Sequence, residues 1–485
     1  MSAELARVGG AVGALGLSLL VLGVGRWWRL GGLAAWAAGC GTLVLWLAPG
    51  GHHRVYAAAA VVGAVAAVLL AVLFLRWPWL LAVAVLACAP ARIPVSIGST
   101  KANLLVPMYL VVAAAALALA WRLFWDEKPV RELGPLAWPL ALLVGWTGLA
   151  FLWAVDRLHG GAPFLLFFVL PFGLLAVSLS RLPWRLGWVV VVYLQLALMA
   201  LVFAGIGIWQ YATRNIYWNP KVKVDNAYAP SSWFYRVNSA FYDPSIYGRF
   251  LVVGILASLV FVLFGRRVAA WTALAVAVVT FVGLVPSFSQ SSFVALAAGI
   301  VVALAAAWGR LAIVPIALAA AVTAAVVLGV PQARHRIFGD QGLSHATSGR
   351  SKLVSNGLDL VRSHPLVGVG TGGFRAAYAE HTGLKGKQPK AAASHDTPIT
   401  VAAETGIPGF VLFAWLVGAA LLLPFRRNPM RGTLTGGTGR ARLAFGLALL
   451  AIVVHSLFYN ALFEDPLFWG LLALSALAAR QSEPE

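Results

Sequence analysis

The sequence predicts an all-α polytopic membrane protein with about 12 to 15 transmembrane helices. Of its 485 residues, 61% are hydrophobic and only 11% are charged, and the mean hydropathy is +0.86. A soluble globular enzyme has an apolar share near half and a charged share near a quarter. Intrinsic disorder is also excluded, because net charge expands a chain only when its hydrophobicity is low. The net charge of +20 needs a separate explanation, and anionic lipid or an anionic substrate is preferred over nucleic acid.

The candidate spans follow from the lengths of the apolar runs. A helix needs roughly 20 mostly apolar residues to cross about 30 Å of hydrocarbon. The segment 77–90 is shorter and is either a further span or a re-entrant segment. The whole chain, 1–485, is predicted to form a single transmembrane domain, whose spans lie near residues 11–25, 31–49, 56–75, 103–124, 136–153, 163–179, 186–212, 246–264, 268–286, 290–309, 311–330, 397–424, 442–460 and 466–480.

The N-terminal apolar stretch and the two cysteines have ordinary interpretations. Arg7 precedes the run 11–25 as in a signal peptide, but further apolar runs follow at once, so we expect a retained first span. Cys40 and Cys88 both lie inside apolar runs. They therefore indicate neither a disulfide framework nor a metal site.

Basic loops predict the orientation. The loop 425–442 contains five arginines and no acidic residue, which places it in the cytoplasm. The turn 265–267 is separated from it by an even number of predicted spans and therefore falls on the same side. Two long segments, 213–245 and 331–396, then lie on the external side. The N-terminal third stays open, because the string RWWR at 26–29 and the string GHHR at 51–54 fall on opposite faces.

The second external loop is itself basic, and two interpretations remain open. It is either a solvated face over anionic lipid or a binding site for a phosphate-bearing substrate. Thr347 and Ser348 form a plausible N-cap for an amphipathic helix that lies on the membrane, with Arg350 in its first turn and Val354, Leu358 and Val361 on one face. The loop's basic residues are Arg334, Arg336, Arg350, Lys352, Arg362, Arg375, Lys385, Lys387 and Lys390.

A glycine-rich string follows at residues 368–373. It matches the G-x-G-x-x-G pattern, but the surrounding sequence has no βαβ unit and an external face has no nucleotide. A tight turn around Gly370 that lets the backbone approach a ligand closely is the preferred interpretation.

His395 stands where the external loop re-enters the membrane. Ser394 and Asp396 are its sequence neighbours and cannot close on it as a catalytic triad. The residue is either a hydrogen-bonded structural histidine or a proton acceptor, for which imidazole is the best-matched side chain near neutral pH. Glu404 follows about two and a half helical turns further along.

Two arginines flank the end of the first external loop. Arg236 lies just outside the membrane and Arg249 inside the next helix. An intramembrane arginine is a functional candidate by default, although Arg249 is close enough to the helix start to snorkel. Nearby aromatic residues suit either sugar stacking or an interfacial belt; they are Trp209, Tyr211, Tyr217, Trp218 and Trp233.

Four strings together resemble the O-antigen ligase and polymerase superfamily of bacterial membrane glycosyltransferases. They are RVNSAFYDPSIYGRF at 236–250, SFSQSS at 287–292, SGRSKLVSNGLDLVRSHPLVGVGTGGF at 348–374 and SHDTPITVAAETGIPG at 394–409, and they occur in the family's order. The first 200 residues or so contribute hydropathy alone. The resemblance implies a GT-C-type fold in the bacterial inner membrane, with the active site on the periplasmic face.

The resemblance also implies an activity. The protein would transfer a glycan from undecaprenyl diphosphate to a sugar hydroxyl of a glycan or lipid A-core acceptor, with inversion and without a metal or other cofactor. Arg236 and Arg350 would hold the diphosphate, His395 would activate or orient the acceptor hydroxyl, and Glu404 would be a supporting residue. Relatives commonly have an arginine in the string that reads SFSQSS here. Gln290 stands at that place in this chain, and Arg249 is the candidate to supply the missing positive charge. Gly370 and Asp396 are secondary candidates for the site.

Other functions stay open at this point. Ligase is preferred over an O-antigen or exopolysaccharide polymerase, but the motifs do not separate them, and a protein O-oligosaccharyltransferase is a further possibility. A transporter or flippase for an anionic lipid-linked substrate would need polar residues at mid-membrane. The spans 56–75, 103–121 and 311–330 have ionisable residues only at their ends, which disfavours transport. The expected partners are the lipid-linked donor, the acceptor and membrane lipids, with no nucleic acid.

Overall fold

The computed structural model confirms an all-α membrane fold. It describes residues 3–23, 25–48, 53–97, 100–125, 132–217, 222–223, 226, 234–314, 316–318, 350–383, 394–425 and 436–481. Within these ranges, 12 helices are long and apolar enough to cross a membrane, at the lower limit of the expected number. The candidate span 311–330 falls mainly outside the described residues.

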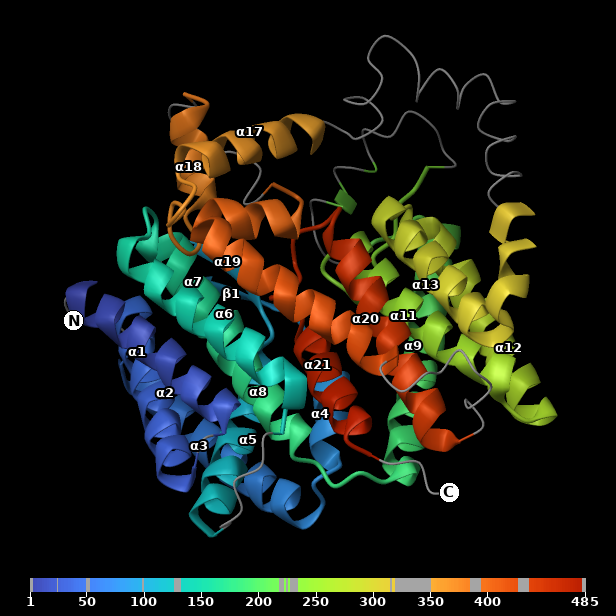
Figure 1. Ribbon diagram of the computed structural model, residues 1–485, viewed down its shortest axis with the longest axis horizontal. Coiled ribbons are helices and arrows are strands. Elements are labelled where there is room, and N and C mark those ends of the chain that lie inside the picture. The colour runs from blue at the N-terminus through green and yellow to red at the C-terminus, as the bar shows by residue number, and fades with distance from the viewer. Residues whose placement is uncertain are drawn as a thin grey trace.

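The N-terminal half contains six long helical spans and a short helix followed by a hairpin (Figure 1). Two of these spans are composite, because short 3-10 or π-helical turns adjoin their α-helices. The elements are α1 (Ala3–Leu22), α2 (Arg26–Leu47), α3 (His53–Arg76), α4 (Leu80–Cys88), β1 (Ile93–Ile97), β2 (Thr100–Leu104), α5 (Val106–Trp125), η1 (Gly134–Leu136), α6 (Ala137–Ala150), η2 (Phe151–Trp153), η3 (Arg157–Gly161), α7 (Ala162–Phe164), η4 (Leu165–Val169) and α8 (Leu170–Ser180).

The C-terminal half adds the remaining spans and two shorter helices outside them, α17 and α18. The elements are α9 (Leu186–Thr213), α11 (Pro244–Phe264), α12 (Arg267–Leu284), η5 (Val285–Ser287), α13 (Gln290–Trp308), η6 (Gly309–Ala312), α17 (Arg350–Ser363), α18 (Phe374–His381), α19 (Thr397–Leu422), η7 (Leu423–Phe425), α20 (Gly437–Ser456) and α21 (Pro466–Ala479).

Two apolar segments are shorter than a full span. The segment expected at 77–90 forms the nine-residue helix α4, which leads into the antiparallel hairpin β1–β2 with Ile93 opposite Leu104. The segment 466–480 forms α21, whose 14 residues rise about 21 Å. The sequence analysis did not expect this hairpin.

Helices α1 and α2 pack through glycines. A Cβ atom added at Gly39 would lie 2.4 Å from Gly13 Cα, and one at Gly32 would lie 2.6 Å from the Gly16 carbonyl oxygen. Small residues at these four positions let the two backbones approach closely, which is how helices associate in lipid without a hydrophobic driving force.

Helix α17 forms as expected, and Val361 of its predicted apolar face packs against a buried cluster, but Leu358 does not. Leu360 is buried and packs in a small cluster with Phe374 and Tyr378 of α18, whereas Leu358 is 41% exposed. Contacts with α18 and α19, which the local sequence does not reveal, select that face. Figure 1 shows α17 and α18 above the end of the bundle at which α19 begins.

The opposite end of the bundle gathers arginines that join neighbouring helix ends. Glu132 pairs with Arg29 at 2.9 Å and with Arg181 at 3.5 Å, and all three side chains are largely buried. Arg442 donates from Nε to the Ala478 carbonyl at 2.9 Å, and Arg26 donates to the Phe124 carbonyl. Arg480, which follows α21, donates to the Ser180 carbonyl beside Arg181, so the RWWR string and the start of α20 lie at the same end. We call this the arginine-rich end.

Glu132 is expected to be essential for stability, because its loss leaves two buried guanidinium groups without their shared acceptor. The change Glu132→Gln should lower the free energy of unfolding by about 3 kcal/mol. Thermal unfolding of the purified protein measures this effect. The control Glu4→Gln breaks the exposed pair with Arg7 and should change stability by less than about 1 kcal/mol; equal effects of the two changes would contradict the assignment.

Candidate active site

His395 directly precedes α19 in an unusual backbone conformation. Its φ angle is +62°, in the left-handed region that non-glycine residues seldom occupy. Both neighbours are anchored: the Ser394 hydroxyl donates to the Asp396 carbonyl at 2.7 Å, and Asp396 Oδ1 accepts the Ile399 N–H at 3.0 Å. This N-cap holds the chain on both sides of the histidine. Burial raises the pKa of the Asp396 carboxyl, while the hydrogen bond from Ile399 opposes that shift.

The segment 457–465, which we call the α20–α21 loop, lies against the start of α19. The Thr397 hydroxyl, two residues after His395, donates to Asn460 Oδ1 at 2.9 Å. The same loop contains Glu464 and Asp465, each of which pairs with an arginine from a distant part of the chain. The loop therefore joins the histidine segment to a cluster of charges.

Arg249 points into the bundle and does not snorkel. Its side chain is 3% exposed, and its Nη2 lies 2.8 Å from Asp465 Oδ2. Asp465 also accepts the Leu467 N–H at 2.9 Å and so caps α21. The other terminal nitrogen of Arg249, Nη1, is buried and has no hydrogen-bond partner among the described residues. One edge of the guanidinium is thus fixed and the other is unsatisfied.

A second arginine reaches the same loop from the segment between α4 and β1. Arg92 Nη1 lies 3.7 Å from Glu464 Oε2, and its Nη2 donates to the Glu464 carbonyl at 3.4 Å. Tyr459 lies near these charged groups. Burial raises the pKa of its phenol, and nearby Asp243 raises it further, whereas Arg92 and Arg249 lower it. The phenol therefore stays protonated near neutral pH.

Arg236 is held by its backbone and by one nitrogen of its guanidinium. Its N–H donates to Asn226 Oδ1 at 2.9 Å, and its Nε donates to the Ser287 carbonyl at 3.1 Å. Neither Nη nitrogen has a protein partner within the described part of the chain. These contacts orient the fork of the guanidinium and leave its two terminal nitrogens available for an anion.

A serine cluster at the start of α13 continues from the Arg236 contact. The Ser289 N–H donates to Ser287 Oγ at 3.2 Å, and Ser289 Oγ lies 2.8 Å from Ser292 Oγ. The Ser291 hydroxyl is 3.0 Å from Nε2 of the buried His455, at the end of α20. Gln290 begins α13 and is exposed, so it lies at the surface of this cluster.

The structure therefore brings four of the expected residues to one end of the bundle. Arg236 and Gln290 lie at the serine cluster, His455 links that cluster to the α20–α21 loop, and the loop contacts Arg249 and the His395 segment. Helix α17 begins at Arg350, whose side chain lies outside the described residues.

Glu404 and Gly370 belong to a neighbouring structure, the glycine turn 368–373. The Glu404 carboxylate accepts the N–H groups of Gly372 at 2.9 Å and Phe374 at 3.2 Å, and so caps α18. Gly370 N–H donates to the Glu404 carbonyl at 2.9 Å. The close backbone approach expected of this turn is made to the chain itself.

A break in α19 receives the segment that leads into this turn. Gly406 has φ +71° and interrupts the helix. The Ile407 N–H donates to the Pro365 carbonyl at 2.8 Å, which satisfies a group that the break frees. Glu404, Gly406 and the glycine turn therefore fix the external helices on α19.

The sequence analysis missed several polar residues of the site. They lie where hydropathy is a poor guide: Tyr459 and Asn460 fall at the end of the expected span 442–460, and Arg92 follows the short segment 77–90. The string Glu464-Asp465-Pro466 contained a usable signal, because an aspartate before proline is typical of a helix N-cap. The missed residues are Arg92, His455, Tyr459, Asn460, Glu464 and Asp465.

The glycine turn allows a matched pair of substitutions. Gly370 has φ +86°, and an added Cβ would lie 2.2 Å from Ala154 Cα. Gly383 has φ +66°, with nothing within 4 Å of an added Cβ. Gly370→Ala should destabilise the protein by about 3 to 5 kcal/mol, through backbone strain plus the clash, and Gly383→Ala by about 1 to 2 kcal/mol, through strain alone. Thermal unfolding compares them, and similar losses would contradict the tight packing of the turn.

Comparison with known proteins supplies a family. Residues 275–414 match the family model described as O-antigen ligase. The match runs from α12 into α19, so it includes Gln290, Gly370, His395 and Glu404 and excludes Arg236 and Arg249. A search of curated proteins finds no match to the chain. Over residues 275–414, this protein with 12 helices that could cross a membrane among its described residues is therefore similar to the O-antigen ligase family.

Proposed function

We propose that the protein is a membrane glycosyltransferase that moves a glycan from undecaprenyl diphosphate to a sugar hydroxyl, as an O-antigen ligase acting on a lipid A-core acceptor. The proposal places it in the bacterial inner membrane with His395 on the periplasmic face. One observation carries the proposal: the segment of His395 and the side chains of Arg236 and Arg249 converge on the α20–α21 loop and the adjoining serine cluster.

The orientation of this site is supported by the distribution of arginines. The arginine-rich end contains the start of α20, and short loops with basic residues face the cytoplasm. Helix α20 begins at that end and finishes at His455, beside the serine cluster. The proposed site consequently faces the periplasm, where a donor must arrive with its leaving group already attached.

The chemistry is a single displacement. The acceptor hydroxyl oxygen bonds to the anomeric carbon while the bond from that carbon to the phosphate oxygen breaks, which inverts the configuration. The bonding electron pair leaves with the lipid diphosphate, and the hydroxyl proton passes to His395, a base suited to neutral pH. Guanidinium groups stabilise the negative charge that develops on the leaving oxygen.

The arginines differ in the number of guanidinium nitrogens that they can offer to a phosphate. Arg236 has both terminal nitrogens available and a fixed Nε, which suits bidentate contact with a phosphate. Arg249 offers only Nη1, since Asp465 occupies Nη2. Arg350 begins α17, on the same external side. We therefore assign the main diphosphate contact to Arg236, with Arg249 supplying part of the charge that relatives draw from the SFSQSS position.

The carboxylates near the site have other roles. Asp243 and Asp465 cap α11 and α21, and Glu464 pairs with Arg92. Cationic side chains then do what a divalent metal held by carboxylates does in other transferases. The proposed transfer consequently requires no metal.

His395 is expected to be essential for transfer but not for folding. His395→Ala should reduce the transfer rate by a factor of about 100 to 10,000, which is typical of losing a general base. The assay follows release of undecaprenyl diphosphate from a lipid-linked glycan, with lipid A-core or a second lipid-linked glycan as acceptor. The control His381→Ala changes an exposed histidine at the end of α18 and should retain activity. Undiminished transfer by His395→Ala would refute the mechanism, and transfer only to the second lipid-linked glycan would identify a polymerase.

Arg236 and the absence of a metal requirement are tested together. Arg236→Gln should lower the transfer rate at least about tenfold, because it removes a charge-assisted contact with the leaving diphosphate. The control Arg375→Gln changes an arginine of α18 that lies in the external part of the chain. Wild-type activity should persist in EDTA. Loss of activity in EDTA that Mg²⁺ restores would overturn the metal-free mechanism while leaving the enzyme class intact.

A further inference from the structure

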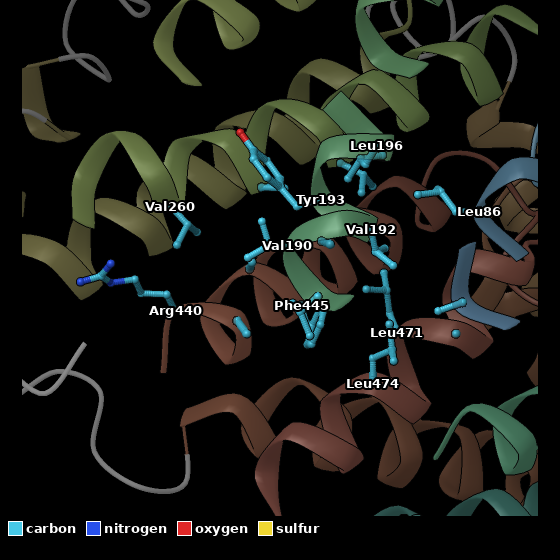
Figure 2. A pocket seen from close by; sticks show the side chains of 18 of the residues that line it. Leu86, Val190, Val192, Tyr193, Leu196, Val260, Arg440, Phe445, Leu471 and Leu474 are labelled. Carbon is cyan, nitrogen blue, oxygen red and sulfur yellow. The ribbon is translucent and has the colours of Figure 1, made fainter. Parts of the chain in front are cut away.

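An apolar cavity of about 290 Å³ opens among α4, α9, α11, α20 and α21 (Figure 2). This volume is at the lower end of the roughly 300 to 1,000 Å³ of ligand pockets. Its lining consists of aliphatic side chains, phenylalanines and glycines, except for Tyr193 and Arg440. Tyr193 directs its hydroxyl to Ser258 Oγ, 3.3 Å away. The wall is therefore suited to a hydrocarbon chain.

The cavity occupies the depth of one leaflet. Along α20 it extends from Gly437 to Ala448, which is about 16 Å of helix. That is close to half of the roughly 30 Å hydrocarbon core. Helices α9 and α20 both begin at the arginine-rich end, and the cavity follows the first part of each. A lipid that enters it comes from the leaflet on that side.

One cationic side chain lines the cavity, and other arginines lie near its lining residues in the sequence. Arg440 lines it, and Figure 2 shows Arg440 at one end of the cavity, with Leu86 and Leu196 at the other. Arg185 immediately precedes the lining residue Leu186, and the exposed Arg266 and Arg267 follow the end of α11. None of the described residues that line the cavity is acidic. The charge pattern complements an anionic headgroup.

We propose that the cavity is a binding site for an anionic phospholipid of the leaflet at the arginine-rich end. One acyl chain occupies the cavity and packs against the apolar side chains of α9, α11 and α20. Arg440 contacts the headgroup phosphate. The donor's isoprenoid chain is not the occupant, because the diphosphate site proposed above lies at the opposite end of the bundle. This lipid site is independent of the proposed transferase activity.

Native mass spectrometry of the full-length protein tests the charge contribution. The protein is equilibrated with mixed vesicles of phosphatidylglycerol and phosphatidylcholine that have the same acyl chains. Wild type should retain phosphatidylglycerol preferentially, and Arg440→Gln should lower that preference about fivefold. The control Arg310→Gln changes an exposed arginine at the same end that does not line the cavity, and it should retain the preference.

A second pair of variants tests the cavity itself. Ala444→Phe fills the space from α20 and should reduce retention of both lipids, whereas Ala269→Phe on the exposed face of α12 should not. Thermal unfolding confirms that each variant is folded. Equal retention of the two lipids by wild type, an unchanged preference in Arg440→Gln, or displacement of phosphatidylglycerol by equimolar undecaprenyl phosphate would each overturn the proposal.

Discussion

The buried ion pair between Arg249 and Asp465 organises the end of the bundle opposite the arginine-rich end. Taking two charges out of water costs several kcal/mol each, and that cost is offset only when the groups meet with good geometry and further hydrogen bonds. Asp465 satisfies this condition by also capping α21. The pair fixes α21 against α11, and the α20–α21 loop between His455 and Asp465 must then lie where Asn460 meets Thr397. The position of the His395 segment thus depends on a contact made elsewhere.

Arginines have different tasks at the two ends of the molecule. At the arginine-rich end, Arg29 and Arg181 share Glu132, and Arg442 binds a backbone carbonyl. These side chains bind acceptors of the protein and join neighbouring helix ends. At the opposite end, Arg236 and Arg249 retain nitrogen atoms without partners among the described residues. An unsatisfied buried cation such as Arg249 is costly in a membrane protein unless a ligand completes it. Under the proposed function, the net charge of +20 therefore has a structural part and a part that binds the ligand.

The sequence was sufficient for the spans and insufficient for the contacts between them. Hydropathy places the long helices because every spanning segment must satisfy its backbone internally. Hydropathy does not separate a polar loop from an apolar run that directly precedes it. Tyr459 and Asn460 were therefore assigned to a span. The interior position of Arg249 depends on Asp465, and no local pattern connects them. The buried face of α17 is likewise chosen by α18 and α19, so Leu358 was placed on the wrong side.

The glycine turn is tied to its surroundings largely through main-chain atoms. Val369 and Gly370 donate to the carbonyls of Ala403 and Glu404, and the Val155 N–H donates to the Val369 carbonyl. Because main-chain groups are the same in every amino acid, substitutions at the non-glycine positions of the turn leave these bonds in place. Helices α17 and α18 can therefore change their surface residues while the backbone frame that holds them on α19 stays the same.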